Sequence, residues 1–295
     1  MIHELPLERR TLHGHFSRDL EPVLTVDPGD RILLSTLESA WHLEPGRYFE
    51  PRDTVLDAGH ALCGPIEVRG AHAGGTLAVR LEALEVGPWG ATVAFGNPGL
   101  GIDWHEEPHV LLWELDPPVG RSGEITLELA PFLGVIGMPP PEPGVHSTIP
   151  PRRWGGNLDC KELVPGSTLY LPIPVDGALL SLGDGHARQG DGEVCGTAIE
   201  CPLARVEVTI SLADRDLTAP AAQTPAGWIT FGLGDDLDEA ARAATAAMLD
   251  LLEREHRLSR LDALALASLV VDLRVTQVVN GTVGVHAVLA YPPPP

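Results

Sequence analysis

The stretch that decides the fold runs from Gly64 to Val86, GPIEVRGAHAGGTLAVRLEALEV. Its second half places apolar side chains at Leu77, Val79, Leu81 and Leu84. Apolar residues that recur at every second position are typical of a strand with one buried face. A glycine-rich turn separates this strand from the run IEVRG before it. We therefore interpret the stretch as strand, turn, strand.

The same design recurs on both sides of this stretch. VLTVDPGDRILLSTL at 23–37 predicts two strands joined by an Asp-Pro-Gly-Asp turn. Further strands are expected at 113–117, 124–130, 167–175, 178–184 and 204–213. The 32 glycines and 28 prolines are spread through the chain, which favours a β-dominated body over a linker. Residues 88–112 and 131–157 lack periodicity, so we expect long loops there that shape a substrate pocket.

The composition changes after about residue 236. Residues 235–275 are rich in Ala and Leu, and their apolar spacing of three and four predicts two helices. Ser259 is a suitable N-cap for the second helix, because Asp262 completes a near capping box. The pair Asn280-Gly281 predicts a β-hairpin.

Together these elements predict a β-dominated α+β fold. We expect one unit, residues 1–295, with a β-rich, β-sandwich-like body at 1–235. The smaller α/β part at 236–295 would hold the helical pair and the terminal hairpin.

Charge and composition exclude several classes of partner. The 295 residues include 20 basic and 41 acidic side chains, for a net charge of -21. Such a surface repels phosphate and anionic lipid, so we expect no nucleic acid and no membrane as partner. The start MIHELPLERR does not resemble a signal peptide, and no run of about 18 apolar residues occurs. The four cysteines lack CxxC spacing, which favours reduced thiols in a cytoplasmic protein.

Polar residues are densest between 155 and 200, where two GDG triplets bracket HARQ. Glycine lets the backbone turn tightly or approach a ligand closely, so we expect Asp159, His186 and Glu193 to converge in one pocket. If 182–186 is extended, Asp184 and His186 point to the same side, and if 191–197 is a strand, Asp191, Glu193 and Cys195 share a face. One histidine among carboxylates suits a divalent ion, zinc above all. The alternative is a set of turn aspartates beside a hydrogen-bonded histidine, because no HExxH or CxxC motif is present.

A longer pattern surrounds these residues. GGNLDCKEL at 155–163, followed by residues 166–200, resembles the central block of the acetamidase/formamidase family. VLTVDPGD, GHALCGPIEVRGAHAGGTLAVRL, PFLGVIGMPP and DLRVTQVVNGTVGVHA resemble family segments in the same order. The resemblance implies a metal-associated hydrolase that cleaves short linear amides to carboxylate and ammonia. It also implies a sandwich-like body and a homodimer or larger homo-oligomer.

The resemblance also implies roles for individual residues. Catalytic positions fall on Asn157, Glu193, Cys195 and Glu200, and metal-binding positions on His60, Asp159, Asp184 and His186. Glu193 would act as the general base toward the attacking water. The expected cofactor is a divalent metal, zinc, with calcium as an option at a second site. The chain departs from the family pattern at 88–112 and 139–154, so the particular amide is not fixed.

Three alternatives stay open. The chain could be a non-catalytic binding or assembly protein with the same fold. Cys195 could be a nucleophile assisted by Lys161, the only lysine. Glu193 could be a buried partner of Arg188 or Arg205. The remaining cysteines are interpreted as packing residues: Cys63, Cys160 and Cys201.

Overall fold

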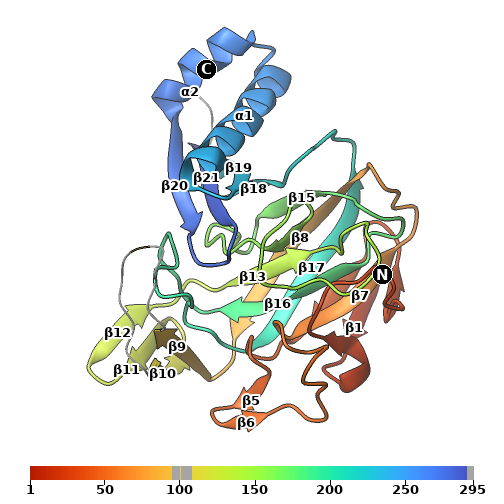
Figure 1. Ribbon diagram of the computed structural model, residues 1–295, viewed down its shortest axis with the longest axis vertical. Helices are drawn as coiled ribbons and strands as arrows, with labels where there is room; N and C mark the ends of the chain where they lie inside the picture. The colour runs from red at the N-terminus through yellow and green to blue at the C-terminus, as the bar shows by residue number, and fades with distance from the viewer. Residues whose placement is uncertain (95–99, 101–107, 291–295) are drawn as a thin grey trace.

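The structure is a computed structural model that describes residues 1–94, 100 and 108–290. The described part consists mostly of strands, arranged in two large and two small sheets, with two α-helices late in the sequence (Figure 1). The predicted β-dominated α+β fold with a sandwich-like body is confirmed.

The larger sheet extends from the body into the C-terminal part. Its strand order is β1 (Ile2–Leu5), β4 (Arg31–Leu34), β17 (Leu203–Ala213), β8 (Thr76–Val86), β15 (Thr168–Pro172), β18 (Ala221–Thr224), β19 (Gly227–Gly234), β21 (Val283–Ala290) and β20 (Val271–Gln277). Because β19 pairs with β21 along its whole length, the sheet passes residue 235 without interruption. The two parts expected from the sequence therefore share one sheet.

The second large sheet carries the polar residues of interest. Its strands are β14 (Gly155–Asn157), β13 (Phe132–Gly137), β16 (Leu180–His186), β7 (Leu62–Val68) and β2 (Leu12–His13), and β3 (Leu24–Val26) pairs with β7 in parallel. The main core joins the two large sheets, with Ile66 and Leu182 from this one and Leu77 and Val208 from the other. Burial of apolar side chains between the sheets holds β16 in the interior.

Two small sheets project from the body (Figure 1). One contains β12 (Ile125–Glu128), β11 (Val119–Ser122), β10 (His109–Asp116) and β9 (Trp89–Ala94), and the other pairs β5 (His42–Glu44) with β6 (Arg47–Tyr48). A short 3-10 helix spans Arg9–Thr11.

The expectation of unstructured loops at 88–112 and 131–157 is wrong in part. β9, part of β10, β13 and β14 lie within those ranges, while residues 95–99 and 101–107 lie outside the described part. Glycines and tryptophans interrupt the apolar alternation in these ranges, so the sequence pattern does not reveal the strands. The strands form because neighbouring strands supply the backbone hydrogen bonds.

Both helices occur where the sequence predicts them. α1 (Leu237–His256) and α2 (Arg260–Val270) follow one another, and the Ser259 side chain accepts a hydrogen bond from the backbone of Asp262. α1 packs on β19 and β21 (Figure 1) through Ala240, Ala244 and Met248. A side chain at Gly232 would lie 2.0 Å from the Ala240 carbonyl oxygen, so glycine is required where helix and sheet touch. No helix of the described residues is long and apolar enough to cross a membrane.

The two expected strand-turn-strand segments form strands, but not hairpins. β7 and β8, which flank the turn in 64–86, belong to different large sheets. β3 and β4, which flank the turn in 23–37, are divided in the same way. β7 pairs with β16 and β8 with β17, so each turn carries the chain from one sheet to the other. The hairpin predicted at Asn280 is confirmed, since β20 and β21 pair antiparallel.

Candidate active site

The candidate site is centred on His186, the last residue of β16. Its Nε2 atom lies 3.2 Å from Asp184 Oδ1 and 3.2 Å from Glu200 Oε1. All three side chains are buried. Glu200 is held in place because His186 and Glu200 form a β-bridge and Glu200 Oε1 accepts a hydrogen bond from the Ala198 backbone. The prediction that Asp184 and His186 face one side is confirmed.

Two turns add further carboxylates to this centre. Asp159 follows β14 with φ 52°, and Glu193 lies in the turn after β16 with φ 48°. Such left-handed backbone is strained for residues with a side chain and is common at functional sites. The ligand atoms of Asp159, His186 and Glu193 lie within 4.8 Å of one another, as do those of Asp184, His186 and Glu200. The structure therefore confirms that Asp159, His186 and Glu193 converge.

Gly134 of β13 provides the space between two of these carboxylates. A Cβ atom at this position would lie 2.3 Å from Asp184 Oδ2 and 2.7 Å from Asp159 Oδ1. Both distances are well below van der Waals contact. The close approach of the carboxylates to each other therefore requires a glycine here.

The buried charges of the site shift one another's pKa values. Burial, together with the charge of Asp159, raises the pKa of Glu193 to about 11. Burial also raises the pKa of Asp159 to about 7, and it raises the pKa of Glu200. Burial alone would lower the pKa of His186, but the charges of Glu200 and Asp184 raise it well above its ordinary value. One imidazole cannot neutralise four carboxylates, so without another cation some carboxylates must hold protons.

Unpaired oxygen atoms indicate that a cation fits this space. Among the described residues, Asn157 Oδ1, Asp159 Oδ1, Glu193 Oε2 and Glu200 Oε2 are buried without a hydrogen-bond partner. Buried acceptors are normally satisfied, because leaving one unpaired costs about 1–3 kcal/mol. A divalent ion would satisfy several of them at once and would neutralise the carboxylates. Imidazole nitrogen with carboxylate oxygen is a donor set that suits zinc or manganese.

The predicted strand at 191–197 is absent, although Glu193 and Cys195 still line one pocket. These residues form turns, and Glu193 turns inward through its left-handed backbone. Cys195 is half-buried, and its thiol donates to the Thr197 carbonyl oxygen at 3.4 Å. The two glycines on either side of the turn break the strand, because Gly192 and Gly196 have φ near 90°. Neither residue group of the candidate site includes Cys195.

The arginine partners considered for Glu193 are occupied elsewhere. Arg188 Nη1 donates to the Glu128 carbonyl oxygen at 2.6 Å. Arg205 forms ion pairs with Glu85 and Glu207. Within the described part of the chain, no ion pair joins either arginine to Glu193. The interpretation of Glu193 as half of a structural ion pair is therefore not supported.

Asn157 and His60 lie at the margin of the site. Asn157 donates from Nδ2 to the Ile149 carbonyl oxygen at 3.1 Å, which leaves its Oδ1 atom free to accept. His60 contacts Thr148 Oγ1 through Nδ1 at 2.8 Å. Its charge helps that of His186 to hold the pKa of Asp184 well below the ordinary range against the effect of burial. His60 belongs to neither ligand group among the described residues, so its role as a metal ligand stays a prediction.

Two residues that hold Asp159 carry no signal of this role in the sequence. Asn280 Nδ2 donates to Asp159 Oδ2 at 2.6 Å, and Gln189 Nε2 donates to the Asp159 carbonyl oxygen at 2.9 Å. The sequence around Asn280 predicts only a hairpin turn, and nothing local to it indicates a partner 121 positions away. The backbone of the hairpin also touches the site, because Gly192 forms a β-bridge with Gln277. The C-terminal hairpin is therefore part of the site's wall.

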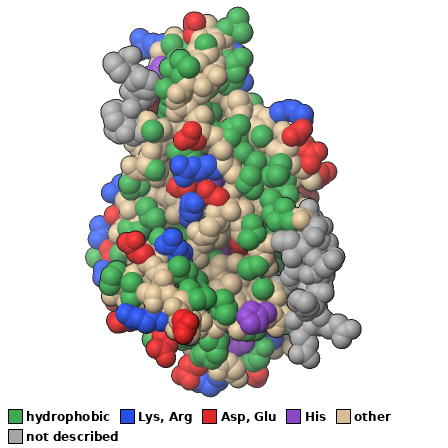
Figure 2. All heavy atoms as spheres, turned by 90° about the vertical axis from the view of Figure 1, so that its left-hand side faces the viewer, with side chains coloured by type: hydrophobic (Ala, Val, Ile, Leu, Met, Phe, Trp, Pro, Cys, Tyr) green, Lys and Arg blue, Asp and Glu red, His purple; other side chains and the backbone are tan. Residues whose placement is uncertain are grey.

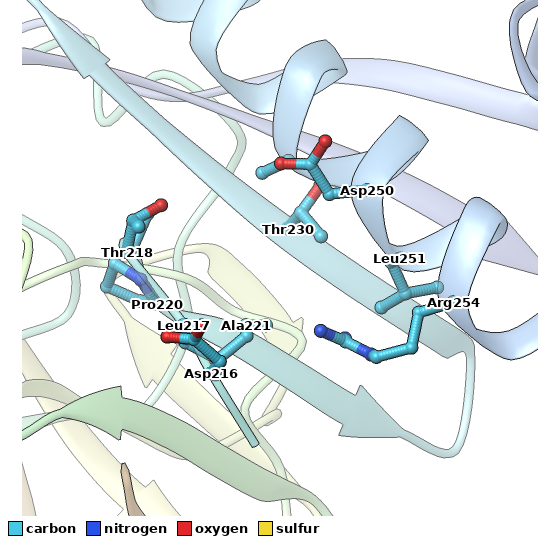
Figure 3. Close-up of a pocket in the computed structure, with 11 residues that line it drawn as sticks. Asp216, Leu217, Thr218, Pro220, Ala221, Thr230, Asp250, Leu251 and Arg254 are labelled. Carbon is cyan, nitrogen blue, oxygen red and sulfur yellow. The ribbon is translucent and has the colours of Figure 1, made fainter. Parts of the chain in front are cut away.

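A pocket of about 250 Å³ lies beside Glu193. Its wall includes Trp113, Leu127, Cys195 and Ile199, so it offers a mostly apolar space next to the carboxylate. Figure 3 shows another pocket, enclosed by the segment from Asp216 to Ala221, by Thr230 and by α1. That pocket holds only about 40 Å³, enough for a few water molecules at most. The pocket beside Glu193 is therefore the better candidate for a small organic substrate.

The fold and the site together define the class of this protein. It is a strand-rich protein with a sandwich-like body whose buried centre holds one histidine among four carboxylates. A family model described as the acetamidase/formamidase family matches residues 3–146 and 142–292. The chain belongs to this family.

Individual relatives agree with this assignment. The acetamidase of Mycolicibacterium smegmatis is 27% identical over 261 residues, which covers 64% of this chain and 63% of that protein. The formamidase of Methylophilus methylotrophus is 26% identical over 251 residues, covering 64% and 61%. The crystal structure of an acetamidase from Bacillus halodurans superposes with a TM-score of 0.85 at 30% identity and covers 97% of both chains. The chain thus spans less than two thirds of the curated relatives it matches.

Proposed function

We propose that the protein is a metal-dependent amidohydrolase that cleaves a small linear amide, of the formamide or acetamide type, to carboxylate and ammonia. The observation that carries this proposal is the buried centre in which four carboxylate side chains surround one histidine and leave several oxygen atoms unpaired. Family membership supports the reaction class. The names of the relatives support the size and type of substrate.

His186, Asp159 and Asp184 would hold the ion in this proposal. His186 belongs to two overlapping ligand groups, one with Asp159 and Glu193 and the other with Asp184 and Glu200. When bound, a divalent ion such as zinc polarises an amide carbonyl and lowers the pKa of a coordinated water to about 7. Glu200 Oε1 and Asp184 Oδ1 both lie 3.2 Å from His186 Nε2, so the two carboxylates together fix the orientation of the ring.

Glu193 is the proposed general base. It is buried beside the proposed ion site and has an oxygen atom without a hydrogen-bond partner, and a bound cation would favour its ionised, proton-accepting form. It takes the proton of the attacking water and passes it to the leaving nitrogen, which departs as ammonia. Asn157 Oδ1, which is unpaired, would accept a hydrogen bond from the substrate NH₂ group and so orient the amide.

The two rival functions have less support. Nucleophilic attack by Cys195 would need an activating base, but its thiol donates to Thr197 while Lys161 pairs with Asp191 at 2.8 Å. A non-catalytic protein has no need to bury four carboxylates at a cost to the stability of its fold. Unpaired buried carboxylates destabilise a fold, so their presence favours a function that uses them.

The proposal includes a homodimer or larger homo-oligomer and a cytoplasmic location. Exposed leucines on α2 support association, as argued below for the whole molecule. All four cysteines are free thiols, three of them buried, which is consistent with a reducing compartment.

Ammonia release tests the function and its metal dependence separately. The purified protein is incubated with formamide, acetamide and propionamide before chelation, after chelation, and after zinc or manganese is restored. We expect release that disappears with the metal and returns with it. Full activity in protein shown to be metal-free would overturn metal dependence, and no release from any amide by the metal-loaded protein would overturn the amidohydrolase assignment.

A further inference from the structure

A second group of metal-ligand side chains lies next to the segment that carries Asp159. Cys160 Sγ is 3.4 Å from Glu162 Oε2, and His286 Nε2 is 3.4 Å from the same oxygen. The three atoms lie within 4.8 Å of one another. Cys160 and His286 are fully buried, and Glu162 is buried at the edge of the group. The proposed mechanism uses none of these side chains.

His286 points an unpaired nitrogen into this group. Its Nδ1 atom contacts Thr276 Oγ1 at 2.8 Å, which fixes the orientation of the ring. Nε2 is buried and has no hydrogen-bond partner among the described residues. The 3.4 Å separation from Glu162 exceeds the usual 2.7–3.2 Å of an N–H···O bond. The ring is therefore oriented toward a point between the three side chains rather than bonded to one of them.

The separations match the edges of a tetrahedral metal site. Zinc binds oxygen and nitrogen at about 2.0–2.2 Å and thiolate sulfur at about 2.3 Å. Tetrahedral angles then place neighbouring ligand atoms roughly 3.3–3.7 Å apart. Both separations from Glu162 Oε2, 3.4 Å to sulfur and 3.4 Å to nitrogen, fall in this range.

Hydrogen bonds between the group and residues around it also indicate a metal site. Glu162 uses its other oxygen, Oε1, to accept from Arg274 Nη1 at 2.9 Å, so Oε2 faces the group, where it accepts from the Cys160 thiol whose proton a bound metal would displace. Thr276 holds the outer nitrogen of His286. In known metal sites, ligating imidazoles and carboxylates usually have such hydrogen-bonded partners. A dication would balance a Cys160 thiolate and the Glu162 carboxylate in charge.

We propose that Cys160, Glu162 and His286 form a second, structural metal site that binds zinc or a similarly thiophilic divalent ion. A thiolate ligand selects zinc over calcium, so the calcium option considered for a second site does not apply here. The ion would tie the segment after β14 to β21, and so would anchor the hairpin that presents Asn280 to Asp159.

Cobalt substitution tests this site without depending on hydrolysis. The full-length protein is stripped of metal and titrated with Co²⁺, and absorption is followed in the near ultraviolet, where thiolate-to-cobalt charge transfer appears. We expect a charge-transfer band whose final intensity corresponds to one thiolate-bound cobalt ion per chain, whether or not the candidate active site also takes up cobalt. Cys160→Ser should abolish the band, whereas Cys63→Ser, a buried cysteine outside the group, should leave it unchanged. Asp159→Asn should also retain the band, which separates this site from the candidate active site.

X-ray absorption of the zinc-loaded wild type gives an independent measurement. We expect a sulfur neighbour at about 2.3 Å, amounting to one sulfur per chain averaged over all bound zinc ions, and one zinc ion fewer per chain in His286→Gln. This measurement stands even where Cys160→Ser does not fold. Absence of both the band and the sulfur neighbour in the wild type, or a band that persists in Cys160→Ser, would overturn the proposal. If the metal-loaded wild type shows the band but hydrolyses no amide, the proposed function is overturned and the proposed second metal site is not.

Discussion

Glu193 is the residue on which the proposed chemistry depends most directly. Glu193→Gln keeps the size of the side chain but removes the proton acceptor. General acid-base groups contribute about 10² to 10⁴-fold, so kcat should fall at least about 100-fold with the protein still folded and metal-loaded. Steady-state ammonia release and elemental analysis measure both quantities. Cys195→Ala is the matched control and should cost less than about tenfold, whereas loss of turnover there, with a thioester trapped on the wild type, would establish the cysteine route.

Asn280 acts on the site through Asp159. Asn280→Ala removes the donor at 2.6 Å from Asp159 Oδ2, so the carboxylate is less firmly held and less stabilised as an anion. Loss of such an outer partner typically weakens metal binding by about 10 to 100-fold. Competition with a chromophoric chelator measures the affinity. Thr282→Ser, in the same hairpin, should retain wild-type affinity, and equal affinity in Asn280→Ala would show that the contact does not position Asp159.

His13 gives the fold a defined dependence on pH. Burial lowers its pKa to about 4, against the hydrogen bond to the His15 carbonyl oxygen, which raises it. The unfolded chain takes up this proton near pH 6.5, so stability present at neutral pH is lost as the pH falls from 6.5 toward 4. The shift in the pKa of His13 corresponds to a loss of about 3 kcal/mol in the free energy of unfolding at pH 4. Urea unfolding at pH 7 and pH 4.5 should show a smaller difference for His13→Gln than for the wild type, while the exposed His72→Gln should behave as wild type.

At the residue scale, sequence reasoning recovers the centre better than its surroundings. Glycine-flanked polar residues within 45 positions predict the convergence of Asp159, His186 and Glu193, because glycine permits turns that direct side chains to one point. Only the strand expected at 191–197 is wrong, because left-handed backbone at Glu193 and its flanking glycines forms turns there, while Glu193 and Cys195 still line one pocket. Asn280 and Gly134 could not be identified, because their importance comes only from contacts across the fold.

Strand β13 contributes to the site through the side chain it lacks. Gly134→Ala would place a methyl group within 2.3 Å of Asp184 Oδ2 and 2.7 Å of Asp159 Oδ1. Both carboxylates belong to metal-ligand groups, so they cannot move aside without leaving them. We expect kcat/KM to fall about 100-fold or more, since displacements near 1 Å have effects of this size. Metal content and circular dichroism would distinguish a displaced site from an unfolded protein; activity within threefold of wild type would contradict the assignment.

At the scale of elements, local sequence predicts strands and helices but not which strands pair. The segments 23–37 and 64–86 both satisfy the local requirements for a hairpin, yet their strands belong to opposite sheets. Pairing is decided by partners far away in sequence, such as β16 for β7 and β17 for β8. The helices were predictable because capping and spacing are local, as the Ser259 cap shows.

On the scale of the whole molecule, the C-terminal part presents an apolar face to solvent. Figure 2 shows hydrophobic side chains on the surface of the lobe at its top. Leu261 and Leu269 of α2 are 76% and 82% exposed, and Leu264 and Leu273 are also exposed. Clustered exposed leucines are uncommon on monomers and mark interaction surfaces. Leu261, Leu264 and Leu269 belong to α2, and Leu273 belongs to β20, an edge strand of the nine-stranded sheet.

If the proposed homo-oligomer buries this face, Leu261→Lys combined with Leu269→Lys should shift the protein toward the monomer in sedimentation velocity. The side chains are exposed, so the melting temperature of the protomer itself should change little. Leu237→Lys, at the start of α1 and partly exposed, is the control. An unchanged sedimentation coefficient would place any subunit contact elsewhere.

The contact between Asn280 and Asp159 also has a consequence for biosynthesis. A ribosome synthesises Asp159, His186 and Glu193 well before Asn280, which follows Asp159 by 121 positions. Until the hairpin that carries Asn280 has left the ribosome and packed against the body, the side-chain amide that orients Asp159 is absent from the site. An ion captured during translation would therefore meet an incomplete cage, whereas one captured after release would meet the finished one. Metal acquisition by this protein is thereby expected to be a post-translational event.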